Sequence, residues 1–441
     1  MARTTVAKSQ PKVLDRRLVV VGAMLIQLCL GTLYAWSVFT PYLTDPTGIF
    51  KFTSTQTQVI FSVTLATFAV VMMLAGRWQA QSGPRIVTLV GGAVLGAGYI
   101  LAGLFGQTFW AQVLFMGLVA GTGIGLTYVC PIAVGVKWYP DKKGLITGLG
   151  VAGFGFGALI WVQLAGNWGG LLARIGVLQV FLIYGIIYAV TIIACSNWMV
   201  NPPAGWAPKG WKPPKPAKPA KGKAAVKVDY LPNEMLRTPQ FYAIWVMYIF
   251  ASMAGLMVIG NIQFFGIDAL QERAGMTALE ASAVAGLAMA VFYSLANGTG
   301  RIIWGLISDK IGYKLSMVTM CGAQGVVMFL FYAMGGAPAL LYLAALLIGF
   351  NYGGCFTLFP MLTADMFGAT NLGRNYGFVF TAYGIGGIAG PILAGMLRDA
   401  SLRNGTGLQG WLTVFIICGV ACLGAAVIGW FVKPPQATQA A

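Results

Sequence analysis

The chain has few charged residues and no histidine. Of its 441 residues, 9% are charged and 58% are apolar, whereas an ordinary soluble domain carries roughly 25% charged residues. This shortage excludes a soluble enzyme, because so much apolar surface needs lipid as its solvent. The absence of histidine excludes imidazole metal sites, histidine-containing catalytic triads and histidine proton relays.

Cofactor motifs are also missing. The seven cysteines stand singly within apolar runs, without metal-site spacing, so we interpret them as small buried residues. One GxGxxG match, at 148–153, lies inside an apolar run rather than between a strand and a helix, and no GxxxxGK[ST] motif occurs. We therefore expect no metal, no other cofactor and no enzymatic activity.

Apolar runs of about 20 to 30 residues recur along the chain, and each can cross a hydrocarbon layer of roughly 30 Å as a helix. Twelve such runs lie near 18–43, 57–80, 85–106, 110–138, 144–166, 174–200, 239–270, 279–307, 313–334, 337–366, 375–396 and 410–432. The predicted fold class is an all-α integral membrane protein with twelve transmembrane helices.

The net charge of +17 would suggest a nucleic-acid partner in a soluble protein. In a membrane protein the distribution of this charge first indicates the topology, because positively charged segments are translocated across the membrane less readily. With the N-terminus inside, the inner segments hold 22 lysines and arginines and the outer segments hold 5. We therefore expect both termini in the cytoplasm and no nucleic-acid partner. One further cation, Arg301, belongs to neither side.

A basic, proline-rich stretch divides the chain into two sets of six spans. Its proline spacing favours an extended, semi-rigid linker. The expected divisions are a cytoplasmic tail at 1–17, a six-helix half at 18–200, the cytoplasmic linker at 201–238, a second six-helix half at 239–432 and a cytoplasmic tail at 433–441.

The two halves repeat at a constant separation of 229 residues. The matched pairs are Gly31 and Gly260, Gly76 and Gly305, Gly83 and Gly312, Arg85 and Lys314, Pro131 and Pro360, Gly148 and Gly377, Gly155 and Gly384, and Gly157 and Gly386. Because each half has an even number of spans, the halves share one topology and are related by a pseudo-two-fold axis along the membrane normal.

The second copy carries an intact loop motif, Gly305-Leu-Ile-Ser-Asp309-Lys310-Ile-Gly312-Tyr-Lys314, whose first copy lacks the acid and one base. It resembles the GxxxD(R/K)xGx(R/K) loop of the major facilitator superfamily, which implies the twelve-helix major facilitator fold. The glycines permit a tight turn, and the acid can pair with helix ends or basic groups to hold a cytoplasmic gate closed, or the turn serves topology alone.

Arg301 is the candidate substrate residue. A cation in hydrocarbon costs several kcal/mol unless it faces a cavity or a partner, and a guanidinium offers two parallel donors to a carboxylate. Asn297 lies one helical turn earlier on the same face. The alternatives are an ion pair with Asp268 and a gating arginine satisfied by carbonyl groups.

Tyrosines at midmembrane depth can complete the hydrogen bonds of a carboxylate while their rings exclude water. The candidates are Tyr34, Tyr128, Tyr352 and Tyr383. For each one, core packing is an equally good interpretation.

Four local sequences resemble the oxalate/formate antiporter and monocarboxylate transporter group of the superfamily. They are Tyr34-Ala-Trp36 and the segments at 138–148, 234–241 and 374–377. Oxalate-type members of this group have a second central cation, a lysine, where this chain has Tyr383. One cation favours one negative charge, and the apolar Leu33 and Phe154 suit the short tail of lactate or pyruvate. The alternative is an oxalate/formate-type organic anion exchanger.

The acid and lysine that couple protons in animal monocarboxylate transporters align here with Asn297 and a neutral residue near Val38. The remaining proton-coupling candidates are Asp268 and Asp365, which can equally be salt-bridge residues at an interface.

The resemblance thus implies a proton-coupled secondary transporter that works by alternating access in a lipid bilayer, as a monomer, at the bacterial inner membrane. A solute sensor that keeps the transporter fold is the alternative from another class.

Overall fold

The computed structural model describes residues 14–141, 143–166, 168–203, 206–208, 229–368 and 370–435. Residues 1–13 of the expected N-terminal tail, 436–441 of the C-terminal tail and most of the expected linker lie outside the described residues.

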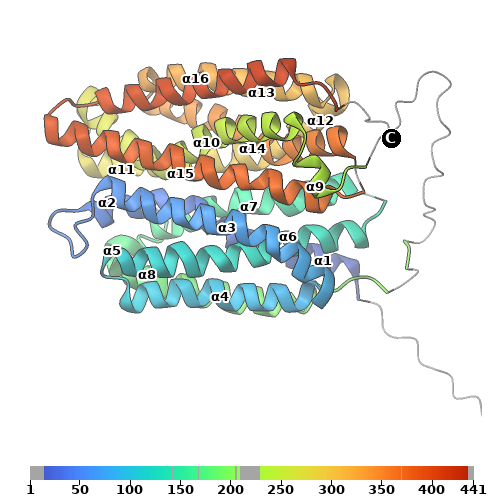
Figure 1. Cartoon of the computed structure of the whole chain (residues 1–441). Helices are drawn as coiled ribbons and strands as arrows, with labels where there is room; N and C mark the ends of the chain where they lie inside the picture. Colours follow the sequence, from blue (N-terminus) through green and yellow to red (C-terminus); the bar gives the residue numbers. More distant parts are fainter. Residues whose placement is uncertain are drawn as a thin grey trace, which may run out of the picture.

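The described residues form twelve helical spans, as the apolar runs predict. Three of the spans combine an α-helix with a tighter or wider helical segment (Figure 1). In the first half, the first span consists of α1 (Arg16–Leu30), η1 (Gly31–Ala35) and α2 (Trp36–Thr44), and the fourth consists of α5 (Phe109–Gln112), η2 (Val113–Ala120) and α6 (Gly121–Trp138). The other spans of this half are α3 (Ser54–Ser82), α4 (Pro84–Phe105), α7 (Lys143–Ala165) and α8 (Leu171–Ser196). After the short α9 (Pro232–Met235), the second half has α10 (Pro239–Ala274), an eighth span made of α11 (Ala278–Leu287), η3 (Ala288–Tyr293) and α12 (Ser294–Ile311), and then α13 (Tyr313–Met334), α14 (Pro338–Phe367), α15 (Leu372–Asn404) and α16 (Gln409–Phe431).

Some boundaries differ from the predicted ones because capping groups extend the helices beyond the apolar runs. Thr53 and Gln56 form a capping box, so α3 begins at Ser54 rather than near 57. Helix α15 continues to Asn404, whereas the apolar run ends near 396. The charged side chains after position 396 therefore lie on the last two turns of α15, whereas the sequence predicts a loop there.

Backbone geometry supports the internal duplication. Gly83 and Gly312, which are 229 residues apart, have nearly identical torsions, with φ 83° and ψ 155° in one and φ 84° and ψ 153° in the other. Both end the second span of their half in the left-handed region that favours glycine. Likewise, Gly157 packs against the first span of its half at Gly31, and Gly386 packs against the seventh span at Ser252.

The two sets of six helices pack mainly among themselves and meet along two long seams. Helix α3 lies against α15, and α7 lies against α12. In Figure 1 the helices coloured blue to green lie below those coloured yellow to red. We call the end of the molecule where α8 ends and α10 begins the linker end, and the opposite end, where α2 leads into α3, the far end.

Candidate functional site

Arg301 lies in the middle of α12, at the seam with α7, and is 1% exposed. Its Nε donates to Oδ1 of Asn297 at 3.1 Å, one turn earlier, as the sequence spacing predicts. Its Nη1 donates to the backbone carbonyl of Val151 in α7 at 2.7 Å. Arg301 therefore joins the two halves of the molecule by one hydrogen bond between α12 and α7.

The Arg301 guanidinium is incompletely satisfied. Its Nη2 makes no hydrogen bond of normal geometry among the described residues and has the Tyr128 hydroxyl nearby, and the Nδ2 of Asn297 is in the same position beside the Tyr293 hydroxyl. Leaving a buried donor unpaired costs about 1–3 kcal/mol, and more for a charged group. Two such donors, one of them on a cation, can be satisfied by the oxygens of an anion.

Two aromatic rings cover the guanidinium. Its central carbon lies 4.1 Å from the ring centroid of Phe356 in α14 and 5.7 Å from that of Phe154 in α7. Such cation–π contacts stabilise the charge where water is excluded, but they accept no hydrogen bonds. The rings therefore keep the cation in place and leave its hydrogen-bonding capacity to a ligand.

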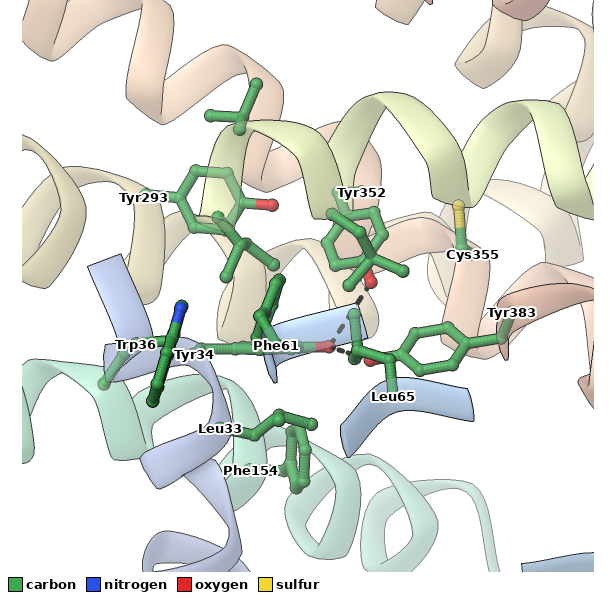
Figure 2. Close-up of a cluster of buried hydrophobic side chains, with 14 of the residues drawn as sticks. Leu33, Tyr34, Trp36, Phe61, Leu65, Phe154, Tyr293, Tyr352, Cys355 and Tyr383 are labelled. Atoms are coloured by element: carbon green, nitrogen blue, oxygen red, sulfur yellow. Dashed lines mark hydrogen bonds between the residues drawn. The ribbon is translucent and has the colours of Figure 1, made fainter. Parts of the chain in front are cut away.

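Three of the four predicted tyrosines come together beside Phe154. The hydroxyl oxygen of Tyr34 lies 3.5 Å from that of Tyr352 and 3.4 Å from that of Tyr383 (Figure 2). These distances exceed the usual 2.7–2.8 Å for O–H···O bonds, so the three hydroxyls are weakly bonded to one another. They can exchange these long bonds for bonds to a ligand at little cost.

The fourth predicted tyrosine, Tyr128, lies on α6 at the edge of this cluster. Its ring meets Phe154 edge to face, with centroids 5.3 Å apart, and it contacts Phe68 in the same way at 5.2 Å. The charge of Arg301 acts on the hydroxyls of both Tyr128 and Tyr34. The predicted tyrosines thus surround one buried centre together with the arginine.

Sequence reasoning missed three participants. Tyr293 ends η3, and its hydroxyl donates to the carbonyl of Gly255 at 3.3 Å beside Tyr352. Nothing in the sequence pointed to Phe356, because one phenylalanine among 26 cannot be singled out as a contact of Arg301. The carbonyl of Val151 is a backbone group and has no signature in a sequence.

Asp268 does not pair with Arg301. Its two oxygens accept from Nε and Nη2 of Arg398 at 2.7 and 2.9 Å, and Trp411 Nε1 donates to one of them at 2.9 Å. The Nη1 of Arg398 donates to the hydroxyl of Ser54 in α3 at 2.7 Å. The alternative that Arg301 forms an ion pair with Asp268 is therefore wrong, and Arg398 instead ties α10 to the α3 seam at the far end.

Asp399 strengthens the same connection. Its carboxylate accepts from the backbone N–H groups of Ser54 and Thr55 at 2.9 and 2.8 Å, and from the Thr55 hydroxyl at 2.6 Å. A carboxylate at this place also faces the positive end of the α3 dipole. We call Asp268, Arg398, Asp399, Ser54 and Thr55 the far-end latch, since these residues hold the two halves together there.

The remaining predicted residues lie at the linker end, away from Arg301. Asp365 is exposed near the end of α14 and lines a cavity of about 590 Å³ with Lys314. Gly305, Asp309 and Lys310 lie within α12, and Gly312 caps it, so the motif acid is on a helix and not in a loop. Asp309 is exposed and makes no ion pair or hydrogen bond within the described ranges.

The centre can therefore hold one carboxylate. A single guanidinium would supply the charge, the two donors could bind the carboxylate oxygens, and the tyrosine hydroxyls could complete the polar contacts. Phe154 and Leu33 provide an apolar wall for a short tail (Figure 2).

Comparison with known proteins agrees with this architecture. Residues 25–292 and 269–441 match the family model of the Major Facilitator Superfamily. The chain is 31% identical to an uncharacterized MFS-type transporter, YhjX, of Escherichia coli (strain K12), over 85% of this chain and 86% of the relative.

It is also 29% identical to the oxalate:formate antiporter of Oxalobacter formigenes, with 94% of this chain and 90% of the relative covered. It is 22% identical to apicoplast pyruvate carrier 1 of Toxoplasma gondii, with 92% and 88% covered. These matches confirm the predicted resemblance and describe transporters, not enzymes. The chain is a multi-pass membrane protein that belongs to the major facilitator superfamily.

Proposed function

We propose that the protein is a secondary active transporter of small monocarboxylates of the lactate and pyruvate class. The observation that carries the proposal is the buried Arg301 guanidinium, whose Nη2 and whose neighbour, the Nδ2 of Asn297, make no hydrogen bond of normal geometry among the described residues. The substrate carboxylate satisfies both donors and neutralises the charge. The names of two relatives, an oxalate:formate antiporter and a pyruvate carrier, support a small organic anion as substrate.

A monoanion fits the charges at the centre. Tyr383 carries no positive charge and its hydroxyl meets those of Tyr34 and Tyr352, so Arg301 faces the substrate without a second cation in the described part of the cluster. A dianion would leave its second carboxylate buried and unpaired, which is strongly unfavourable. The tail of a three-carbon acid lies against Phe154 and Leu33.

The two seams between the halves support alternating access. When the halves rock about the centre, the far-end latch opens on one side and the packing at the linker end opens on the other. An unpaired cation is costly to enclose, and pairing it with substrate lowers the cost of the closed form. The substrate therefore favours the closed form by pairing with Arg301.

We infer that transport is coupled to protons and that Asp268 and Asp365 are the acids that carry them. Asp268 is favoured because it lies in the far-end latch, where protonation weakens its hold on Arg398. We also infer a monomer in a bacterial inner membrane, with the linker end and both termini in the cytoplasm, from the distribution of positive charge.

The test is uptake by the purified protein in liposomes. Labelled lactate, pyruvate, formate and oxalate are compared, with and without a pH gradient. We expect lactate or pyruvate to be taken up fastest, and acid outside to accelerate uptake. Preference for oxalate, or uptake that needs a counter-anion inside and ignores the pH gradient, would establish the alternative, an oxalate/formate-type anion exchanger.

A further inference from the structure

A second polar cavity lies between the halves, nearer the far end than Arg301. Its volume is about 150 Å³, far above the roughly 10–15 Å³ that one water molecule needs. Residues of α2, α7 and α8 line it on one side, and residues of α10 and α11 line it on the other. The lining comprises Val38, Tyr42, Val162, Gln163, Gly166, Gln263, Ser282 and Gly286, with six further small or apolar residues.

Gln163 is the unusual member of this lining. Its side chain is 1% exposed, yet neither Nε2 nor Oε1 has a hydrogen-bond partner among the residues described. A buried primary amide with both polar atoms unsatisfied costs several kcal/mol, because each lost bond to water costs about 1–3 kcal/mol. This cost is removed by a group that supplies one acceptor and one donor together.

Gln263 faces the same space with an unpaired oxygen. Its Nε2 donates to the backbone carbonyl and the hydroxyl of Ser282 at 2.8 and 2.9 Å, which fixes the amide and leaves Oε1 without a partner within the described ranges. Gly286 lies next to this oxygen, and a methyl group there would stand 3.7 Å from it. The cavity therefore presents one free amide NH2 group and two free amide oxygens among the described residues.

The lining carries no formal charge. Among the described residues of the lining, only Tyr42 is titratable, and a tyrosine is neutral near pH 7. The nearest charged groups lie around the cavity and not in it: Arg174 beside Gly170, Glu280 beside Leu279, and Arg398 in the far-end latch. An anion would lose its hydration here without gaining a cation, so the cavity favours a neutral ligand.

We propose that this cavity binds the undissociated carboxylic acid form of the substrate, through a two-point pair with Gln163. The Nε2 group donates to the acid's carbonyl oxygen, and Oε1 accepts the acid's O–H, so both free atoms of the amide are satisfied. A carboxylate cannot do this, because it has no O–H and sets an oxygen against Oε1. The inference rests on the proposed transport of monocarboxylates.

A larger cavity of about 770 Å³ adjoins it at the far end. The two cavities share Tyr42, Leu279 and Ser282 in their linings, and the larger one reaches Arg403. An acid that entered from that side would meet Gln163 before Arg301. The two sites then differ in chemistry: the outer amide selects the protonated acid, and the central guanidinium selects the anion.

The test is equilibrium dialysis of the purified full chain with labelled propionamide, which keeps the donor and acceptor edge and has no charge at any pH. We expect saturable binding that does not change between pH 5.5 and 7.5, and at least tenfold weaker binding in Gln163→Leu. Gly286→Ala, which adds a methyl group to the cavity, weakens binding by a smaller factor. Gln324→Leu is the matched control, because Gln324 is also buried and unpartnered within the described chain but lies outside this lining.

Labelled propionic acid tests the protonation state. With a carboxyl pKa near 4.3, as in Glu, the undissociated fraction rises almost 100-fold from pH 7.5 to 5.5, and the apparent affinity of the Gln163 site rises by the same factor. Undiminished propionamide binding by Gln163→Leu, or no saturable binding by the wild type, overturns the inference. Failure of the proposed function is separate, since it shows as absent liposome uptake and leaves propionamide binding intact.

Discussion

Arg301 is buried and Arg398 is partly buried among the same membrane helices, and their surroundings are opposite. Arg398 is saturated: Asp268 accepts from two of its nitrogens and Ser54 accepts from the third. Arg301 faces no acid within the described part of the chain, and one of its nitrogens has no partner.

This difference separates a structural cation from a binding cation. A saturated ion pair resists exchange, because any new ligand must first displace a carboxylate. An arginine whose hydrogen-bond partners are a neutral amide and a neutral carbonyl keeps its full charge available to an anion. The protein therefore combines an arginine that joins its halves at the far end with one that, under the proposed function, gains stability from a bound anion.

The largest expected effect separates the two arginines directly. Arg301→Lys removes the two-pronged donor geometry, so we expect lactate uptake in liposomes to fall at least 100-fold, about 3 kcal/mol, while the melting temperature stays within a few degrees. Arg398→Lys is the matched control, with less than tenfold loss of uptake and a clear loss of stability. Uptake by Arg301→Lys at the wild-type rate would refute the central role of Arg301.

The next effect concerns the latch. Asp268→Asn leaves the partly buried Arg398 without its counter-charge, and we expect a loss of about 1–3 kcal/mol in stability, seen as a lower melting temperature in detergent. Asp45→Asn is the control, because Asp45 is an exposed loop residue bonded only to Thr47 and the neighbouring backbone. Equal melting temperatures for both variants would show that the latch is not stabilising.

A smaller effect is expected in the tyrosine cluster. Tyr383→Phe keeps the ring and removes one long hydrogen bond, so the KM for lactate should rise about three- to tenfold, or roughly 1 kcal/mol. Tyr184→Phe loses a hydroxyl that bonds to the carbonyl of Trp161, away from the centre, and should leave KM unchanged. An unchanged KM in Tyr383→Phe assigns Tyr383 to packing alone.

The smallest effect is expected from Asp399→Asn, which removes the negative charge at the start of α3. The interaction between this side chain and the positive end of the helix should weaken by about 0.3–1 kcal/mol. The far end should then open two- to fivefold more often. The measurement is alkylation of Val38→Cys, a buried position behind the latch, with the native cysteines all buried. Arg403→Gln, one turn further along the same helix, is the control. A rate that Asp399→Asn does not change contradicts a closing role for the latch.

Much of the fold could be predicted from the sequence, because membrane insertion depends on composition over about 20 residues. All twelve spans were predicted in this way, and the repeat of 229 residues anticipated the matching torsions of Gly83 and Gly312. The ends of α3 and α15 were less predictable, since capping hydrogen bonds extended them past the apolar runs.

The sequence by itself determined that the chain lies in lipid, that its halves repeat and that Arg301 is an exceptional cation, because each property follows from residue type and spacing. Only the tertiary structure decided which acid pairs with which arginine, and that a carbonyl of Val151 and the ring of Phe356 hold the unpaired one. The reason is physical. Pairing depends on distances between helices far apart in the chain, and a backbone carbonyl acquires its role only when packing aims it at a partner.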